Sequence, residues 1–152
     1  MSGIRENLLR VTERIEKAAQ NSGRNLKDIR LVAVSKTVET DRVREAIEAG
    51  VTILGENYVQ EAQKKIEEIG KSVSWHFIGH LQSNKAKVVV RLFDVIQSMD
   101  SVALAEELNR RAHQANQKIP VMIEVNLSGE TTKFGTEEEK VTALAQGVCA
   151  RS

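Results

Sequence analysis

The sequence has little cysteine and few aromatic residues, and it has no long apolar run. Its one thiol, Cys149, cannot form an internal disulfide, which favours a reducing compartment over secretion. No stretch of about 18 apolar residues is present, so no membrane span is expected. Residues 1–17 mix apolar and charged side chains and lack the apolar core of a signal peptide. We therefore expect a cytoplasmic protein that does not bind membranes.

Positive and negative charges are nearly balanced in the sequence. The chain carries 22 lysine and arginine residues against 21 aspartate and glutamate residues, a formal net charge of +1. A nearly neutral protein has no overall field that attracts a polyanion, so nucleic acid is not an expected partner. Lys85, Lys87 and Arg91 form a basic stretch without interleaved aromatic residues, and a solvated helix face accounts for it better than a nucleic-acid site.

Glycine is missing where nucleotide-binding loops need it. A dinucleotide fingerprint would place G-x-G-x-x-G after the first predicted strand, but residues 35–38 read Ser-Lys-Thr-Val. The phosphate-loop pattern G-x-x-x-x-G-K-[ST] is also absent. His76 and His80 are four residues apart, but they lie on and just beyond a predicted strand, with no third metal ligand evident. We interpret His76 as a structural histidine and His80 as a more open loop residue.

What the sequence does contain is a regular alternation of helix and strand patterns. Residues 4–21 carry apolar side chains at spacings of three and four, which predicts a helix with these side chains on one face. Short apolar runs then alternate with amphipathic segments, and the run 31–34 is typical of a strand buried on both faces. The predicted strands are 31–34, 51–54, 75–78, 93–96 and 121–125. The predicted helices that follow them are 40–50, 57–69, 83–92, 102–115 and 136–148.

One helix followed by five βα units predicts a parallel sheet with helical crossovers, in a single domain spanning residues 1–152. Two architectures fit this pattern: an open doubly wound sheet and a barrel. A complete (β/α)8 barrel needs roughly 200 residues or more, and the chain has 152. The pattern alone therefore favours the open sheet.

Lys36 is the residue with the clearest potential for chemistry. It follows the first predicted strand, at the carboxyl end where α/β sheets and barrels bind ligands. Partial burial of a lysine there would free its amine as a nucleophile, which imine formation with an aldehyde requires. The competing interpretation is a lysine whose head simply reaches water at the end of a strand.

Two further polar segments follow strands at the same expected edge of the sheet. Asn57 either faces a ligand or caps the next helix, with Gln60 completing a capping box, and the two roles can coexist. The loop 126–135 follows the fifth strand, and its Lys133 is long enough to reach an anion; a plain connecting loop is the alternative. Thr136 and Glu139 predict a second capping box.

Four stretches together resemble a known family. They are LVAVSKT (31–37), GENYVQE (55–61), WHFIGHLQSNK (75–85) and IEVNLSGETTKFG (123–135). In this order and spacing they are similar to stretches of the pyridoxal phosphate homeostasis proteins, a family that looks like the amino-terminal barrel of alanine racemase standing alone. The resemblance covers the chain from about Ile4 to Gly147.

The resemblance implies an α/β fold of the (β/α)8 type, in place of the open sheet that the pattern favours. It implies that Lys36 holds pyridoxal 5′-phosphate as a Schiff base, and we place Asn57 and His80 beside the cofactor. It also implies storage or delivery of that cofactor, with dependent apoenzymes as possible recipients and without turnover, so no catalytic residue is expected. An amino-acid racemase is the alternative, but it needs a second acid/base group opposite the lysine. In alanine racemase that group comes from another domain.

Family members continue with three more strands and their helices, and they carry LSMGMS and GSTxVRIG stretches that hold the cofactor phosphate. Neither stretch occurs in this sequence. We therefore expect an incomplete barrel of about five βα units, preceded by a helix and lacking its carboxyl-terminal part. Full-length relatives are expected to be monomeric. This chain is expected to bind the cofactor weakly and to self-associate through unpaired edges at its first and fifth strands.

Overall fold

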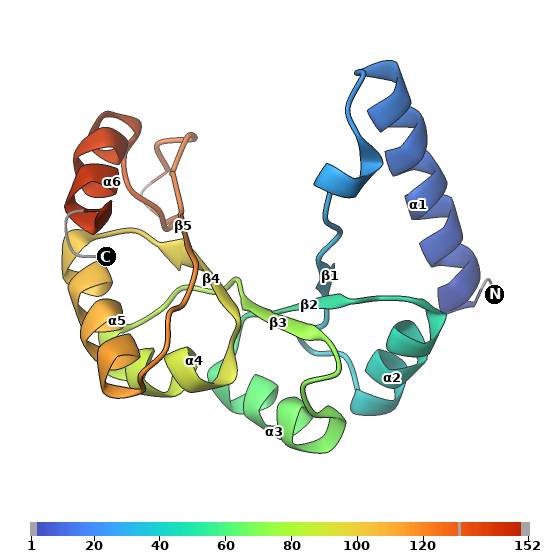
Figure 1. Cartoon of the computed structure of the whole chain (residues 1–152), viewed down its shortest axis with the longest axis horizontal. Helices are drawn as coiled ribbons and strands as arrows, with labels where there is room; N and C mark the ends of the chain where they lie inside the picture. The colour runs from blue at the N-terminus through green and yellow to red at the C-terminus, as the bar shows by residue number, and fades with distance from the viewer. Residues whose placement is uncertain (1–2, 131, 150–152) are drawn as a thin grey trace.

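The computed structural model describes residues 3–130 and 132–149, which form a curved parallel sheet with helices along its outer side (Figure 1). The helices are α1 (Ile4–Asn21), α2 (Thr40–Ala49), α3 (Val59–Ile69), α4 (Ala86–Leu92), α5 (Val102–Gln114) and α6 (Val141–Cys149). The strands are β1 (Ala33–Val34), β2 (Ile53–Glu56), β3 (Ser74–Phe77), β4 (Val95–Met99) and β5 (Val121–Ile123). Three short 3₁₀ turns are η1 (Leu26–Asp28), η2 (Ser83–Lys85) and η3 (Glu138–Lys140). The predicted order of one helix and five βα units is confirmed.

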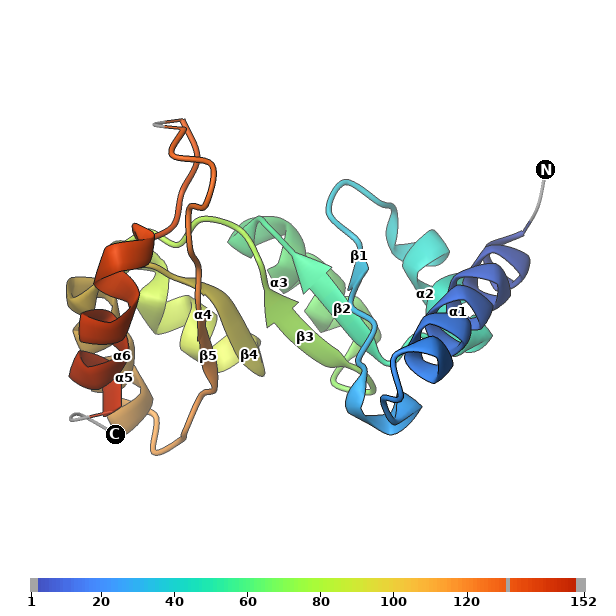
Figure 2. The same cartoon turned by 90° about the horizontal axis from the view of Figure 1, so that it is seen from above.

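The strand order decides between the two architectures. The strands lie side by side in the order β1-β2-β3-β4-β5, and all neighbours are parallel. A doubly wound sheet would reverse its strand order and place helices on both faces. Here α2 to α5 follow the convex side one after another (Figure 1), and Figure 2 shows the strands in sequence from above. The open sheet favoured by the pattern is therefore wrong, and the incomplete (β/α)8-type barrel is confirmed.

The hydrophobic core lies between the sheet and its helices. Leu54, Trp75, Phe77 and Ile96 alternate with residues of the other face, and all four are fully buried against the helical layer. Leu54 and Trp75 are partners across β2 and β3. The rings of Phe77 and Phe93 meet edge-on with their centroids 5.1 Å apart. Burial of large side chains in this layer fixes which face of each strand points toward the helices.

The opposite, concave face is less covered. A Cβ atom added to Gly55 would lie 2.9 Å from Ile78 Cδ1 and 3.1 Å from Val32 Cγ1, so these three residues share that face. Val34 lies two residues beyond Val32 and is 54% exposed. The prediction that residues 31–34 form a strand buried on both faces is wrong, because β1 is short and lies at the edge of the sheet.

The two predicted capping boxes are not formed. Helix α3 begins after Tyr58, which makes no side-chain cap, so Asn57 is not its N-cap. Thr136 instead forms a bridge with Val125, and its N–H donates to the Glu124 carbonyl at 2.8 Å. At Thr136, pairing with the residues after β5 takes the backbone that the local pattern assigned to a cap. None of the helices in the described ranges has the length and apolarity that a bilayer crossing requires.

Candidate functional site

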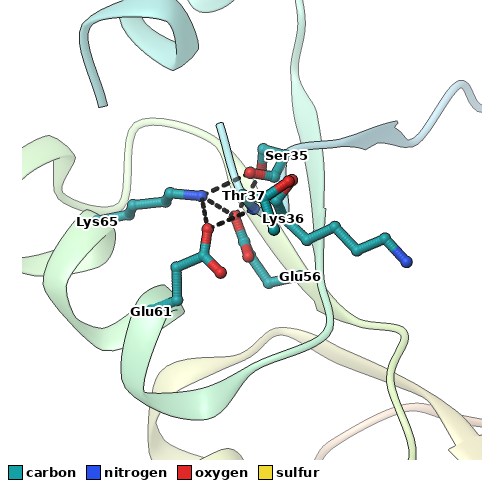
Figure 3. A network of polar contacts seen from close by, with 6 residues as sticks. All are labelled: Ser35, Lys36, Thr37, Glu56, Glu61 and Lys65. Atoms are coloured by element: carbon teal, nitrogen blue, oxygen red, sulfur yellow. Dashed lines mark hydrogen bonds and ion pairs between the residues drawn. The ribbon is translucent and has the colours of Figure 1, made fainter. Parts of the chain in front are cut away.

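Lys36 lies directly after β1, at the carboxyl end of the sheet, as the sequence predicted. The Ser35 N–H donates to the Gly55 carbonyl at 2.9 Å, which carries the strand pairing one residue further. Ser35 is buried, whereas Lys36 begins a turn that the Val38 N–H closes by donating to the Ser35 carbonyl at 3.1 Å. Figure 3 shows the Lys36 ammonium pointing away from Glu61 and Lys65. Lys36 is exposed, so the partial burial considered for it is not found.

A buried ion-pair network lies on the other side of the same segment (Figure 3). Lys65 of α3 is 4% exposed. Its ammonium donates to the Ser35 carbonyl at 2.5 Å, to Glu56 Oε1 at 2.8 Å and to Glu61 Oε1 at 2.6 Å. The Ser35 hydroxyl donates to the same Glu56 oxygen at 2.7 Å. All three N–H groups of the ammonium are therefore used, and the buried charge is paired.

Thr37 is also held by this network. Its N–H donates to Glu61 Oε1 at 2.6 Å, and its hydroxyl donates to the Lys36 carbonyl at 2.6 Å. The φ angle of Thr37 is +62°, a left-handed conformation that costs a residue with a Cβ about 1–2 kcal/mol. Burial acts to raise the pKa of Glu61, but the hydrogen bonds from Lys65 and Thr37 and the Lys65 charge outweigh it. The pKa of Glu61 is therefore lowered.

The loops that follow β2 and β3 are in backbone contact. A Cβ atom added to Gly79 would lie 2.4 Å from the Asn57 carbonyl oxygen and 2.7 Å from its Cα. Only a residue without a side chain permits this approach. Asn57 is half-buried at this end of the sheet. The structure thus places Asn57 at the same edge as Lys36, where the sequence predicted it.

His80 lies in the loop after β3 and contacts the loop after β5. Its ring stacks on Phe134 with centroids 3.7 Å apart and planes 11° from parallel. Its Nδ1 is 4.0 Å from Asp100 Oδ2, just beyond β4. Burial raises the pKa of Glu124, the Asp100 carboxylate raises it further, and His80 acts in the opposite direction. Residues that follow three different strands therefore meet at this edge, and His80 is exposed as expected.

His76 is a buried histidine of the sheet. Its Nδ1 is 2.8 Å from Gln97 Nε2, and the neutral ring can accept the amide proton there. Burial lowers the pKa of His76, Asp94 opposes this and Arg30 adds to it. Its burial and its contact with Gln97 fit the interpretation as a structural histidine. Within residues 3–130 and 132–149, no group of three histidine, cysteine or acidic side chains is arranged to hold a metal ion.

Lys133 pairs within its own loop. Its ammonium lies 2.6 Å from Glu130 Oε1, and both side chains are exposed. The structure brings Lys36, Asn57 and His80 to one edge of the sheet. Lys133, by contrast, forms an ion pair with Glu130, so its ammonium is not held ready for an anion.

The network around Lys65 is the part of the site that the sequence analysis missed. In the sequence of α3, Lys65 has polar or charged neighbours on both sides, Gln63 and Lys64 before it and Glu67 and Glu68 after it. Such a run is typical of a helix face that is exposed to solvent. However, Ala62 and Ile69 are three and four residues away from it, on the stripe that faces the core. A lysine on an apolar stripe is the signal that could have indicated a buried charge with partners.

Comparison with known proteins identifies relatives over nearly the whole chain. The pyridoxal phosphate homeostasis protein of Vibrio alginolyticus is 38% identical over 151 residues, which cover 96% of this chain and 65% of the relative. That of Aquifex aeolicus is 43% identical over 140 residues, which cover 91% of this chain and 61% of the relative. The chain thus spans less than two thirds of the length of these relatives.

A solved structure and a family description agree with these relatives. PipY from Synechococcus elongatus PCC7942, solved with PLP bound, matches with a TM-score of 0.77 and 34% identity. The match covers 91% of this chain and 65% of PipY. The family described as "Alanine racemase, N-terminal domain" matches residues 7–152. Because this match spans nearly the whole chain, the protein belongs to the alanine racemase N-terminal domain family.

Proposed function

We propose that this chain is a single cofactor-binding domain that holds pyridoxal 5′-phosphate through Lys36 and stores or delivers it without turnover. The observation that carries the proposal is the exposed amine of Lys36 at the carboxyl end of the sheet, between two anchored neighbours. The relatives named as pyridoxal phosphate homeostasis proteins support it, as does PipY with PLP bound. Because the chain spans about 65% of those relatives, their function is carried over here as an inference.

The side chains at this edge fit one end of the cofactor. Bound pyridoxal phosphate supplies an aldehyde. With that aldehyde, the Lys36 amine would form an imine and release the carbonyl oxygen as water. Asn57 and His80 are placed to contact the ring in this proposal. For the phosphate end, Lys133 is paired with Glu130, and Lys65 is buried and fully bonded. We therefore expect the affinity to be weak.

Cofactor-dependent apoenzymes are the proposed recipients, and the proposed location is the cytoplasm. The single cysteine of the chain, Cys149, supports the location because its exposed thiol suits a reducing compartment. An amino-acid racemase is the second candidate, favoured by the alanine racemase family match. Racemisation of alanine or serine that disappears in Lys36→Ala would establish this candidate over a storage role.

The test of the proposal is an absorbance titration with pyridoxal 5′-phosphate. We expect the wild-type protein to develop a protonated-imine band and Lys36→Ala to show none. Lys133→Ala is the matched control and should keep the band, because Lys133 is an exposed lysine on another loop. Borohydride reduction followed by peptide mapping should place the label on Lys36. A wild-type protein without a band, or a band that survives in Lys36→Ala, would contradict the proposal.

We also propose that the chain self-associates through the edges of its sheet. Among the described residues, β1 and β5 each pair with a strand on one side only, although Glu124 and Val125 just beyond β5 pair with Thr136. Val34 of β1 and Met122 of β5 are 54% and 52% exposed. We expect the mass measured by sedimentation to rise with protein concentration, and Met122→Lys to reduce this rise. Val88→Lys on the outer surface of α4 should leave it unchanged. A wild-type monomer at every concentration would exclude the idea.

A further inference from the structure

We propose that Glu61 and Lys65 are positioning residues for Lys36. They fix the backbone on both sides of Lys36 so that its amine projects from the concave face at one defined place. The inference rests on the proposed function of Lys36 as the cofactor-binding lysine. It deepens that function by naming the side chains that select this lysine over the others in the chain.

The first step is that both neighbours of Lys36 are held while its own amine is not. The Ser35 carbonyl accepts from Lys65 at 2.5 Å, and the Thr37 N–H donates to Glu61 at 2.6 Å. No hydrogen bond or ion pair holds the Lys36 ammonium among the described residues. The support is therefore aimed at the main chain around Lys36, and the side chain stays available for reaction.

The second step is that the network and the Lys36 amine lie on opposite sides of the turn formed by residues 35–38 (Figure 3). Ser35 is buried toward α3, whereas Lys36 is exposed on the concave side. The network can thus fix the segment without filling the space in front of the amine. It also uses the amine of Lys65, the nearest buried lysine, in three hydrogen bonds, so that this second amine cannot compete for an aldehyde.

The third step identifies Glu61 as the connecting residue. Its Oε1 accepts from both Lys65 and Thr37, and it is the side chain that joins the buried pair to the strained residue after Lys36. A left-handed, β-branched residue persists only where its surroundings hold it. The Glu61 side chain is 27% exposed and lies on a regular helix, so its removal leaves the Lys65–Glu56 pair in place.

The experiment compares Glu61→Ala, Glu61→Gln and Glu68→Ala with the wild type. Pyridoxal 5′-phosphate is titrated by the imine band, and the label trapped by borohydride is mapped over all lysines. We expect Glu61→Ala to weaken apparent affinity by about tenfold or more, because a displaced nucleophile loses its preset geometry. Its label should spread from Lys36 to exposed lysines. Glu61→Gln should retain both properties, since its amide oxygen can still accept from Thr37 and Lys65.

Glu68→Ala is the matched control, because it removes an exposed carboxylate from the same helix without touching residues 35–37. Glu61→Asp is the second variant. It keeps the charge but is too short to reach both donors, so it should lose selectivity in part. Circular dichroism checks that each variant is folded.

A spread of label in a variant that circular dichroism shows to be folded separates positioning from general stability, because unfolding would also make labelling less selective. Unchanged affinity and unchanged selectivity in Glu61→Ala would overturn the inference. A wild-type protein that is not labelled at Lys36 would overturn the proposed function first, and that result is visible before any variant is made.

Discussion

Lys65→Met is expected to lower the free energy of unfolding by about 3–5 kcal/mol, the usual cost of removing one partner of a buried ion pair. The Glu56 carboxylate is fully buried, and its second oxygen, Oε2, has no hydrogen-bond partner among the described residues. Without the Lys65 ammonium, the first oxygen of Glu56 keeps only the Ser35 hydroxyl as a donor. The buried negative charge is then uncompensated, and the native state carries the full cost of its desolvation.

Lys64→Met is the matched control for this variant. Lys64 is the adjacent residue of α3 and is exposed, so its replacement should change the free energy of unfolding by less than about 0.5 kcal/mol. Urea denaturation followed by circular dichroism measures both variants. The double variant Glu56→Met/Lys65→Met should recover most of the loss, because it removes both buried charges. Equal stability of Lys65→Met and Lys64→Met would contradict the pairing described here.

Trp75→Ala is expected to cost about 3–5 kcal/mol of stability, the range for removing a large aromatic side chain from a packed core. Trp75 is fully buried between β3 and the helices. Its indole N–H also donates to the Gly70 carbonyl at 3.1 Å, at the carboxyl end of α3. The substitution therefore leaves a cavity and removes a donor from a helix end.

Trp75→Phe distinguishes the two contributions. It keeps most of the buried volume but cannot donate to Gly70, so we expect a loss clearly smaller than that of Trp75→Ala. Because Trp75 is the only tryptophan, unfolding should be followed by circular dichroism rather than by fluorescence. Nearly wild-type stability of Trp75→Ala would mean that the layer between sheet and helices is not the main core.

The order of helices and strands could be predicted from the sequence because it depends on local periodicity. The apolar residues spaced three and four apart in residues 4–21 predict a helix, and each short apolar run after them predicts a strand. The strand order is a different kind of information. A doubly wound sheet and a barrel wall read alike along the chain, and only the pairing of β1 with β2 and of β2 with β3 separates them. The family resemblance supplied that choice.

In the candidate site, too, the residues marked by local sequence could be predicted, and those that depend on tertiary contacts could not. Lys36 could be singled out because it follows an apolar run at the ligand-binding edge. Glu61 and Lys65 could not, because their roles depend on a contact with residues 35–37, about one βα unit earlier in the chain. The contact of Gly79 with Asn57 was hidden for a similar reason: a glycine in a loop does not indicate which backbone it approaches.

The sequential order of the strands has a consequence for how the molecule is made. Each strand pairs with the strands that precede and follow it in the chain, and each of α2 to α6 packs on the helix before it. A nascent chain can therefore dock every new βα unit onto a surface that has already left the ribosome, without waiting for distant segments. Assembly in the order of translation keeps the growing edge as the main unpaired surface at each stage.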